Sequence, residues 1–353
     1  SVYFVYSDKN NILWAATSNG ISKIEGNSGI SFFNEVNGLK ASVACICRTS
    51  GTIYAGTFTG IYYLENNTFI RIEGINGQTW VIKEFQVPDS DQKIILSGQN
   101  DGCFEITKNE TKLIRPGGVH FDILQSKKFP KRIYLGLKKG LAALEYKNGA
   151  WHDLGTVKGL DYSVRNLVET GQGDLWLSTD INGVVRLQFS GEQNFTNPGI
   201  EFYDTTYGLP HNSDVRIYLA DQKLIFASKK GLYRFNESKS TFEKDQYFTP
   251  YIPSDYKSIY FFMENSAGDI IFSSEWNEFN PVSILKKKKD GYELFNKAFK
   301  RIPEMGIYTI YTDTASIVWI GGTEGLYKYS PDAEPSEKHL KTSIRRSEER
   351  RVG

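Results

Sequence analysis

Apolar and polar positions along this chain form a pattern that returns over its whole length. The stretch IVWIGGTEGLYKYS, residues 317–330, has an apolar run containing Trp319, two small residues, a polar step, Gly325 and then alternating aromatic positions. A tight turn at Glu324–Gly325 explains this order, because glycine adopts the positive φ that short hairpin turns require. The stretch therefore predicts a β-hairpin with strands over residues 317–321 and 326–329.

The same hairpin pattern occurs at seven other places in the chain. Clear copies carry a turn glycine, at Gly20, Gly60, Gly102, Gly140, Gly183, Gly231 and Gly325. Most of these glycines are 38 to 48 residues apart, and the gap of 94 before the last one contains a degenerate copy. That copy, residues 269–285, lacks the glycine and carries Trp276, which predicts a longer hairpin. A period of this size indicates a repeat architecture.

Each repeat contains further strands around its hairpin. An apolar run precedes the hairpin in seven repeats, in the segments VYFVYSD, SVACICRTS, WVIKEFQV, VRNLVET, VRIYLAD, SIYFFMEN and IYTIYTD. Runs that are apolar on both faces are typical of strands buried on both sides. A weaker strand such as ISFFNE follows most hairpins. Four antiparallel strands per repeat predict an all-β fold, a β-propeller of four-stranded antiparallel blades, with eight repeats counted.

The composition favours strands over helices and limits the classes of molecule that the chain could bind. The 353 residues include 21 Tyr and 22 Phe, which favour strands, and no segment shows a helical apolar rhythm. Lys and Arg number 42 against 41 Asp and Glu, so the chain lacks the basic footprint of a nucleic-acid partner. No apolar run is long enough to span a membrane, and no signal peptide opens the sequence.

Residues that could carry chemistry are few and scattered. Cys45 and Cys47 lie two apart on one expected inner strand, where they are small core residues or, as the alternative, a metal or redox pair without the other ligands. The four histidines include no pair at ligand spacing. Acid–base catalysis needs positioned His, Tyr or carboxylate groups, and no repeat adds a converging set. We expect no catalytic residues, no metal and no cofactor.

Two charged segments need an interpretation. LKKKKDGYEL, residues 285–294, is expected to be a solvated outer hairpin tip, with an anionic-ligand patch as the alternative. Residues 346–353, RSEERRVG, match one reading frame of the sequencing-adapter string AGATCGGAAGAGCGTCGTGTAGGG. We therefore expect this tail to be non-native, and expect the natural chain to continue beyond Arg345.

The repeat resembles the two-component regulator propeller repeat. The family pattern D-x-x-x-x-[IL]-W-[IL]-[GAS]-[TG]-x-x-G-[IL]-x-[KR]-[ILFY] is matched by residues 8–24, more loosely by 313–329, and from the Trp onward by 173–187. The segments NGL at 37–39, KGL at 158–160 and YGLP at 207–210 are similar to the motif that the family places between blades. The resemblance covers residues 1–330 and includes six recognisable copies.

The resemblance implies an extracytoplasmic, periplasmic sensor domain of a Bacteroidetes-type bacterium. In this family the propeller is followed by a triple-tyrosine β-sandwich, a membrane helix and a kinase or DNA-binding output. Residues 1–331 would form the propeller, and 332–345 would begin the linker toward the missing sandwich. Two seven-bladed rings are common in the family. Eight repeats therefore imply one of two arrangements. Either the ring has eight blades, or it has seven and the first repeat of the chain belongs to a preceding ring lost by truncation. A homodimer of the full-length protein is also expected.

The candidate site lies at the rim of the central funnel, because loops on a rigid scaffold carry function. Aligning the inner strands gives a column immediately after the first apolar residue: Tyr3, Ala44, Ile82, Arg165, Arg216, Tyr260 and Tyr308. Arg and Tyr there would suit an anionic or polyhydroxylated ligand, with arginines buried against neighbouring carboxylates as the structural alternative. Loops before the inner strands add further rim candidates, namely Trp80, Tyr162, His211, Asn212 and Tyr256.

Three functions fit these patterns. The first is a ligand-sensing propeller of a bacterial transmembrane regulator, which the resemblance implies would respond to a glycan or its breakdown product. The second is a propeller enzyme, a lyase or hydrolase of a glycan or small molecule. The third is a protein-interaction scaffold, although the GH…WD signature of WD repeats is absent. We expect the chain itself to be non-enzymatic.

Overall fold

The computed structural model describes residues 1–7, 12–25, 29–256, 258–275, 282–313 and 316–333, all within antiparallel sheets and their connections. Trp276 of the degenerate repeat and the tail 346–353 lie outside these residues. In the described part of the chain the helical segments are short 3-10 turns: η1 (Glu35–Asn37), η2 (Thr205–Tyr207), η3 (Thr249–Tyr251), η4 (Ala298–Arg301) and η5 (Pro331–Ala333). None of the described helices is long and apolar enough to cross a membrane.

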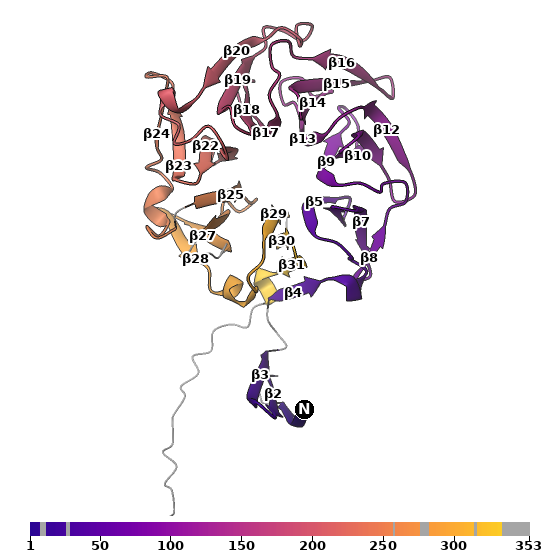
Figure 1. The fold of residues 1–353 in the computed structure, drawn as a ribbon, viewed down its shortest axis with the longest axis vertical. Helices are drawn as coiled ribbons and strands as arrows, with labels where there is room; N and C mark the ends of the chain where they lie inside the picture. Colours follow the sequence, from indigo (N-terminus) through magenta and orange to yellow (C-terminus); the bar gives the residue numbers. More distant parts are fainter. Residues whose placement is uncertain (8–11, 26–28, 257, 276–281, 314–315, 334–353) are drawn as a thin grey trace, which may run out of the picture. The chain divides into compact units, whose positions relative to one another are not determined.

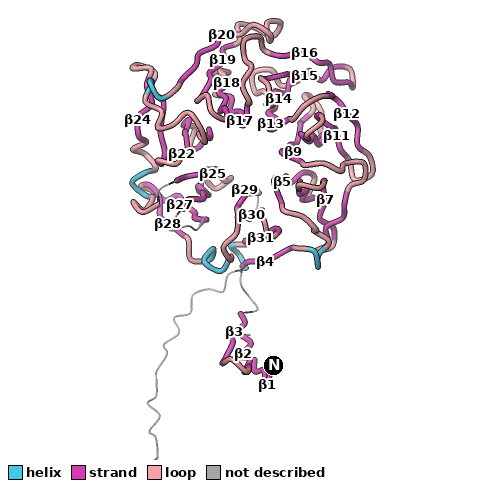
Figure 2. Tube along the Cα trace, viewed as in Figure 1, coloured by secondary structure: helices cyan, strands magenta, loops and turns pink. Residues whose placement is uncertain are grey.

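Seven four-stranded sheets form a ring, which confirms the propeller prediction (Figures 1 and 2). Blade 1 consists of β5 (Val43–Thr49), β6 (Thr52–Thr57), β7 (Gly60–Glu65) and β8 (Thr68–Arg71), and blade 2 of β9 (Thr79–Gln86), β10 (Lys93–Gln99), β11 (Gly102–Ile106) and β12 (Thr111–Pro116). Blade 3 consists of β13 (His120–Gln125), β14 (Arg132–Leu137), β15 (Leu141–Lys147) and β16 (Ala150–Thr156). Blade 4 consists of β17 (Val164–Glu169), β18 (Leu175–Thr179), β19 (Val184–Gln188) and β20 (Gly199–Tyr203).

Blades 5 to 7 complete the ring. Blade 5 consists of β21 (Arg216–Ala220), β22 (Lys223–Ser228), β23 (Gly231–Asn236) and β24 (Thr241–Lys244). Blade 6 consists of β25 (Ser258–Glu264), β26 (Ile270–Glu275), β27 (Val282–Lys288) and β28 (Gly291–Phe295). Blade 7 consists of β29 (Ile307–Thr312), β30 (Val318–Gly322), β31 (Gly325–Tyr329) and β4 (Ile30–Phe33). The first strand of each blade faces the centre, and each inner strand lies beside the next, with β29 beside β5 (Figure 1).

The fourth strand of the last blade comes from the beginning of the chain. Segment ISFFNE was expected to complete the first repeat, but its strand β4 pairs with β31 of blade 7 instead. Phe33 is buried there, with ring centroids 5.6 Å from Phe69 and 6.0 Å from Trp319. The ring therefore has seven blades, and a strand from far away in the sequence closes it.

The rest of the first repeat forms a three-stranded sheet and belongs to a separate compact unit. Its strands are β1 (Val2–Ser7), β2 (Ile12–Thr17) and β3 (Gly20–Glu25). Every residue of β1 is exposed, so the prediction that this strand is buried on both faces is wrong for the unit as it stands. Losing the fourth strand to blade 7 leaves this sheet incomplete.

The hydrophobic core of the ring lies between blades. One buried cluster joins blades 2 and 3 through Phe85, Leu96 and Leu135, and another joins blades 4 and 5 through Trp176 and Phe226. Each inner strand is consequently covered on both sides, which explains its continuous apolar run. The core is a chain of interfaces between blades rather than one central mass.

The small residues in the repeated hairpin are explained by these interfaces. A Cβ added at Gly98 would lie 2.5 Å from the carbonyl oxygen of His120 in the next blade, and one at Gly136 would lie 2.8 Å from that of Val164. The second strand of these blades therefore lies against the backbone of the next inner strand. Glycine is required there for space rather than for φ.

The turn glycines behave as predicted except at one position. Six of the seven have a positive φ, for example 142° at Gly60 and 129° at Gly325. Gly102 does not, so the predicted turn conformation is wrong there. A Cβ at Gly102 would lie 2.6 Å from the carbonyl oxygen of Arg115, and that close approach accounts for the glycine.

Blades 5 and 6 are also joined by charged side chains. The carboxylate of Asp221 accepts hydrogen bonds from the Tyr247 hydroxyl at 2.6 Å and from the ammonium groups of Lys223 at 2.9 Å and Lys287 at 3.3 Å. These donors hold the pKa of Asp221 well below its usual value. The lysine run predicted at a hairpin tip thus places Lys287 in an inter-blade ion pair, and Lys288 pairs with Glu293 at 2.8 Å.

Candidate functional site

Most inner strands of the ring contain one extra residue near their start. The antiparallel ladder skips this residue at Ala44, Trp80, Phe121, Arg165, Tyr260 and Tyr308, one in each of six blades. Such bulges re-aim a side chain away from the regular alternation of the strand. Three of the four residues predicted to share a register, Arg165, Tyr260 and Tyr308, therefore do so.

Two assignments in the predicted column are wrong. Arg216 pairs directly with Ala227 and occupies no bulge, so it is out of register with Arg165. Ile82 is a buried core residue, and Trp80 holds the bulge of blade 2. The error in blade 2 arises because the residue before its bulge is the polar Thr79, whereas the alignment counted from an apolar residue in that place.

Three of the bulge residues contact one another across blades 2, 3 and 4. The rings of Trp80 and Phe121 meet edge to face with centroids 4.9 Å apart. The guanidinium of Arg165 lies 3.7 Å from the Phe121 centroid and 5.5 Å from that of Trp80. We call these residues the Trp80–Phe121–Arg165 cluster. It presents two aromatic rings and a cation in one place.

Two polar side chains from neighbouring hairpin tips hold this cluster. The indole N–H of Trp80 donates to the Asn100 side-chain oxygen at 2.7 Å, and Arg165 Nε donates to the carboxylate of Asp180. The side chains of Arg165 and Asp180 are 40% and 41% exposed. Because this ion pair lies within blade 4 and remains accessible, Arg165 is not an arginine buried between blades.

The other predicted rim residues lie in separate contacts. Tyr308 is 40% exposed and packs against Phe58, with ring centroids 5.2 Å apart. The guanidinium of Arg216 lies 5.2 Å from the ring centroid of Phe261. The backbone oxygen of Tyr260 accepts a hydrogen bond from the Tyr218 hydroxyl at 2.8 Å. The structure therefore does not gather the four predicted residues into one cluster.

The loop candidates have mixed positions. Tyr162 is exposed and meets Phe202 edge to face at 5.8 Å, and His211 is half-buried. Asn212 supports its own loop, because its side-chain oxygen accepts from the Thr205 N–H at 2.9 Å. The Tyr256 hydroxyl accepts from the side-chain amide of Asn296 at 3.1 Å.

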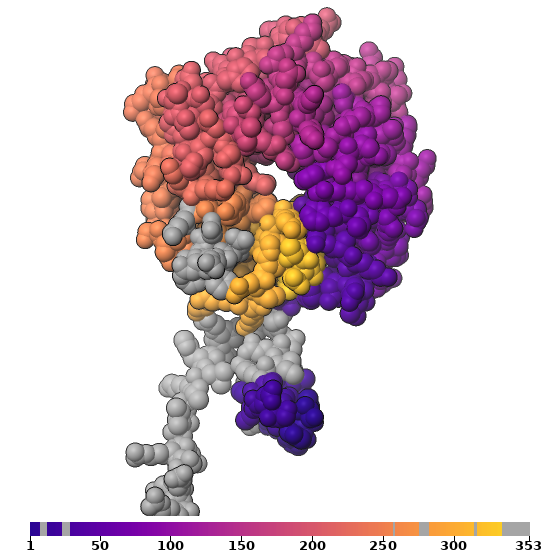
Figure 3. Space-filling view, viewed as in Figure 1, coloured from indigo at the N-terminus to yellow at the C-terminus, as the bar shows by residue number. Residues whose placement is uncertain are grey.

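Below the cluster, polar side chains of one inner strand satisfy the backbone of the next. Asp122 accepts from the Leu167 N–H at 2.9 Å, and Asn166 accepts from the Ile217 N–H at 2.8 Å. Burial raises the pKa of Asp122, opposed by the nearby charge of Lys83 and by the N–H groups of Leu167 and Ile123. The space-filling view shows an opening at the centre of the ring, which these inner strands surround (Figure 3). This layer fixes the inner strands and so positions the cluster.

Nucleophilic and basic groups are enclosed in the core. Burial raises the pKa of Cys47 to about 11 and that of Cys103 to about 12, so neither thiol is ionised near neutral pH. Burial lowers the pKa of His120 to about 4, and this ring is therefore neutral. Within the described residues, no group of three or more His, Cys, Asp or Glu side chains could hold a metal ion.

The cluster can bind a ligand with a flat or ring-shaped face. Aromatic rings offer an apolar surface, while Arg165 and Asp180 supply a charged donor and an acceptor at its edge. Because Asp180 already balances the charge of Arg165, the arrangement suits a polyhydroxylated ligand better than a strongly anionic one. Such an arrangement is suited to binding and orienting a ligand.

Sequence reasoning missed three residues of this site. Phe121 was overlooked because its strand, VHFDILQ, breaks the apolar run with Asp122 and was not recognised as an inner strand. Asn100 and Asp180 were available from the repeat, since both directly follow the end of the second strand in their hairpin. Their shared position at the hairpin tip was the signal.

Comparison with solved structures places the fold among propellers. An extracellular domain described as that of a hybrid two-component system of B. thetaiotaomicron, BT3049, aligns with a TM-score of 0.70 at 18% identity over 94% of this chain. This chain spans 45% of that domain's length. A catalytically inactive virginiamycin B lyase from Staphylococcus aureus, solved with quinupristin, aligns at 0.59 and 14% identity, covering 85% of this chain and 98% of the lyase.

The WD40 propeller domain of Doa1 aligns with a TM-score of 0.56 at 12% identity, covering 84% of this chain and 96% of that domain. No family model matches the sequence, and neither does any curated protein. At these identities the likeness is one of fold.

Proposed function

We propose that this chain is the ligand-sensing propeller of a bacterial transmembrane signalling regulator, and that the Trp80–Phe121–Arg165 cluster contacts its ligand. The observation that carries this proposal is the accessible pairing of two aromatic rings with Arg165 and Asp180 at the bulged start of three inner strands. Half-exposed aromatic and arginine side chains on a rigid scaffold are typical of binding surfaces.

The fold likeness to an extracellular domain of a two-component system supports the sensor role and an extracytoplasmic location, the periplasm. In this proposal the ligand is a glycan or a breakdown product of one, because a sugar ring stacks on aromatic faces while its hydroxyl groups bond to Arg165 and Asp180. Residues 332–345 lead toward a β-sandwich and a signalling domain of the same full-length chain, which would act as a homodimer.

The test is a binding screen against neutral and acidic oligosaccharides, followed by titration of the Arg165→Ala and Trp80→Ala variants. A hydrogen bond from a charged group contributes about 1.5–3 kcal/mol, so Arg165→Ala should weaken binding about 10–100-fold. The ion pair with Asp180 is exposed, and its loss should cost no more than about 1 kcal/mol of stability. A large fall in melting temperature with unchanged affinity would instead make Arg165 a structural residue.

A lyase or hydrolase is the second candidate function, favoured by the fold likeness to virginiamycin B lyase. We expect no turnover, because Asp180, the carboxylate described beside the cluster, is paired with Arg165 and the nearby His120 is buried and neutral. Incubation with oligosaccharides and with a streptogramin B antibiotic checks this. Product release that is abolished by a single substitution at the cluster would establish the enzyme instead.

A further inference from the structure

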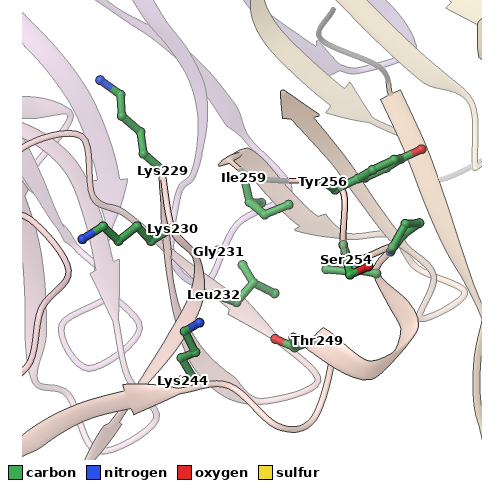
Figure 4. Close-up of a pocket in the computed structure, with 11 residues that line it drawn as sticks. Lys229, Lys230, Gly231, Leu232, Lys244, Thr249, Ser254, Tyr256 and Ile259 are labelled. Carbon is green, nitrogen blue, oxygen red and sulfur yellow. The ribbon is translucent and has the colours of Figure 1, made fainter. Parts of the chain in front are cut away.

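A second concave site lies between blades 5 and 6, away from the Trp80–Phe121–Arg165 cluster. The cavity has a volume of about 490 Å³ and lies between the β22–β23 hairpin of blade 5 and the segment around η3 that leads into blade 6 (Figure 4). This volume is within the range of about 300–1,000 Å³ typical of small-molecule pockets. Its floor is apolar, formed by Leu232, Ile252 and Ile259.

The polar groups of the pocket include one ammonium that points inward. Figure 4 shows the Lys244 ammonium directed toward Leu232 and Thr249, whose hydroxyl faces it, while Lys230 points away. No acidic residue is among those that line the pocket. The cavity therefore combines an apolar floor with an unbalanced positive charge.

The acidic residues adjacent to Lys244 in the sequence do not form an ion pair with it. Glu243 pairs with Lys239 at 2.8 Å. Asp245 is fully buried, and one of its oxygens accepts backbone hydrogen bonds from Phe248 at 2.6 Å and Thr249 at 3.1 Å. In the part of the chain that the structure describes, Lys244 has no ion-pair partner. Asp245 thus positions Thr249 and leaves the charge of Lys244 available.

We propose that this pocket binds a small organic anion, with a carboxylate on Lys244 and Thr249 and an apolar ring on the floor. A carboxylate accepts charge-assisted hydrogen bonds from an ammonium and a further bond from a hydroxyl, and both bonds are stronger in a partly enclosed cavity. This organic anion belongs to a different class of ligand from the neutral sugar that suits the Trp80–Phe121–Arg165 cluster. The two sites lie on different blades.

Cyclohexanecarboxylate and its neutral isostere cyclohexanecarboxamide are suitable probes, titrated by ligand-observed NMR. We expect the acid to bind at least tenfold more tightly than the amide. Lys244→Ala should weaken acid binding tenfold or more, while Lys230→Ala, which removes an equal charge from the same pocket wall, should change it less than twofold. Thermal melts of both variants should match the parent, because both side chains are exposed.

A third variant, Arg165→Ala, separates this site from the proposed sensing site. Acid binding that survives Arg165→Ala and is lost in Lys244→Ala supports the pocket, whatever the oligosaccharide screen shows. Equal weakening in Lys244→Ala and Lys230→Ala would mean non-specific attraction and would overturn the proposal. Absence of acid binding, or loss in Arg165→Ala alone, would overturn it as well.

Discussion

Replacing Gly98 by alanine tests the packing that holds the blades together. The added Cβ would lie 2.5 Å from the His120 carbonyl oxygen and 2.8 Å from Val81 Cγ1, whereas ordinary contacts begin at 3.4 Å. Blade 3 would have to move away by the difference, 3.4 − 2.5 = 0.9 Å, because a backbone oxygen cannot rotate aside. Overpacking of this kind costs about 1–3 kcal/mol.

For a ring of this size, 1 kcal/mol corresponds to about 2 °C, so the melting temperature should fall by about 2–6 °C. Gly77→Ala is the matched control, since Gly77 lies in the connection that leads into the same blade, has no atom within 4 Å of the added Cβ and has no positive φ. That change should be neutral or stabilise by up to about 1 kcal/mol, because alanine restricts the unfolded chain. Calorimetric melts give both values. If the Gly98→Ala and Gly77→Ala variants have the same melting temperature, the close approach of blades 2 and 3 does not constrain residue 98.

Three further outcomes are expected. Asp221→Asn should destabilise the ring at neutral pH, because the Tyr247 hydroxyl and two lysines depress the folded pKa of Asp221. This stabilisation is complete above the ordinary pKa of 3.8 and is lost as pH falls toward the depressed value. The difference in melting temperature between parent and variant should therefore shrink below about pH 4, and a constant difference would contradict this explanation. The three buried cysteines should react with a thiol reagent only after denaturation, and rapid labelling of the native protein would show that their strands open readily. Deleting residues 1–28 should leave the melting of the ring unchanged, whereas Phe33→Ala should cost about 3–5 kcal/mol. Equal melting of Phe33→Ala and parent would exclude β4 as the closing strand.

The fold was predictable because its determinants are local and repeated. Seven of the eight hairpin copies carry a turn glycine, so together they identify the blade although the eighth copy is degenerate. The partner of β4 was not predictable in this way. A strand such as ISFFNE has the same local pattern whether it completes its own repeat or blade 7, and ring closure alone decides between the two.

The candidate site was predictable only in part, for a different reason. Arg165 and Trp80 stood out as polar or aromatic residues at the start of inner strands. Their contact depends on bulges, and a bulge shifts the register by one residue without leaving a mark in the apolar pattern. Arg216 was misplaced because the β21–β22 ladder has no bulge, and Phe121 was missed because its strand was not recognised as an inner strand. Neighbours across blades therefore follow from the ladder rather than from aligned sequence.

Closure by β4 also determines how the ring would respond to tension along the chain. The polypeptide joins the ring at β4 and leaves it at β31, and these two strands are hydrogen-bonded neighbours, with a further bond from the Ser330 N–H to the Gly29 oxygen at 2.7 Å. A pull applied to the flanking segments would load this one strand pair and bypass the other six blades. The β31–β4 pair would therefore separate first under tension, and force spectroscopy should record this separation before the other six blades unfold.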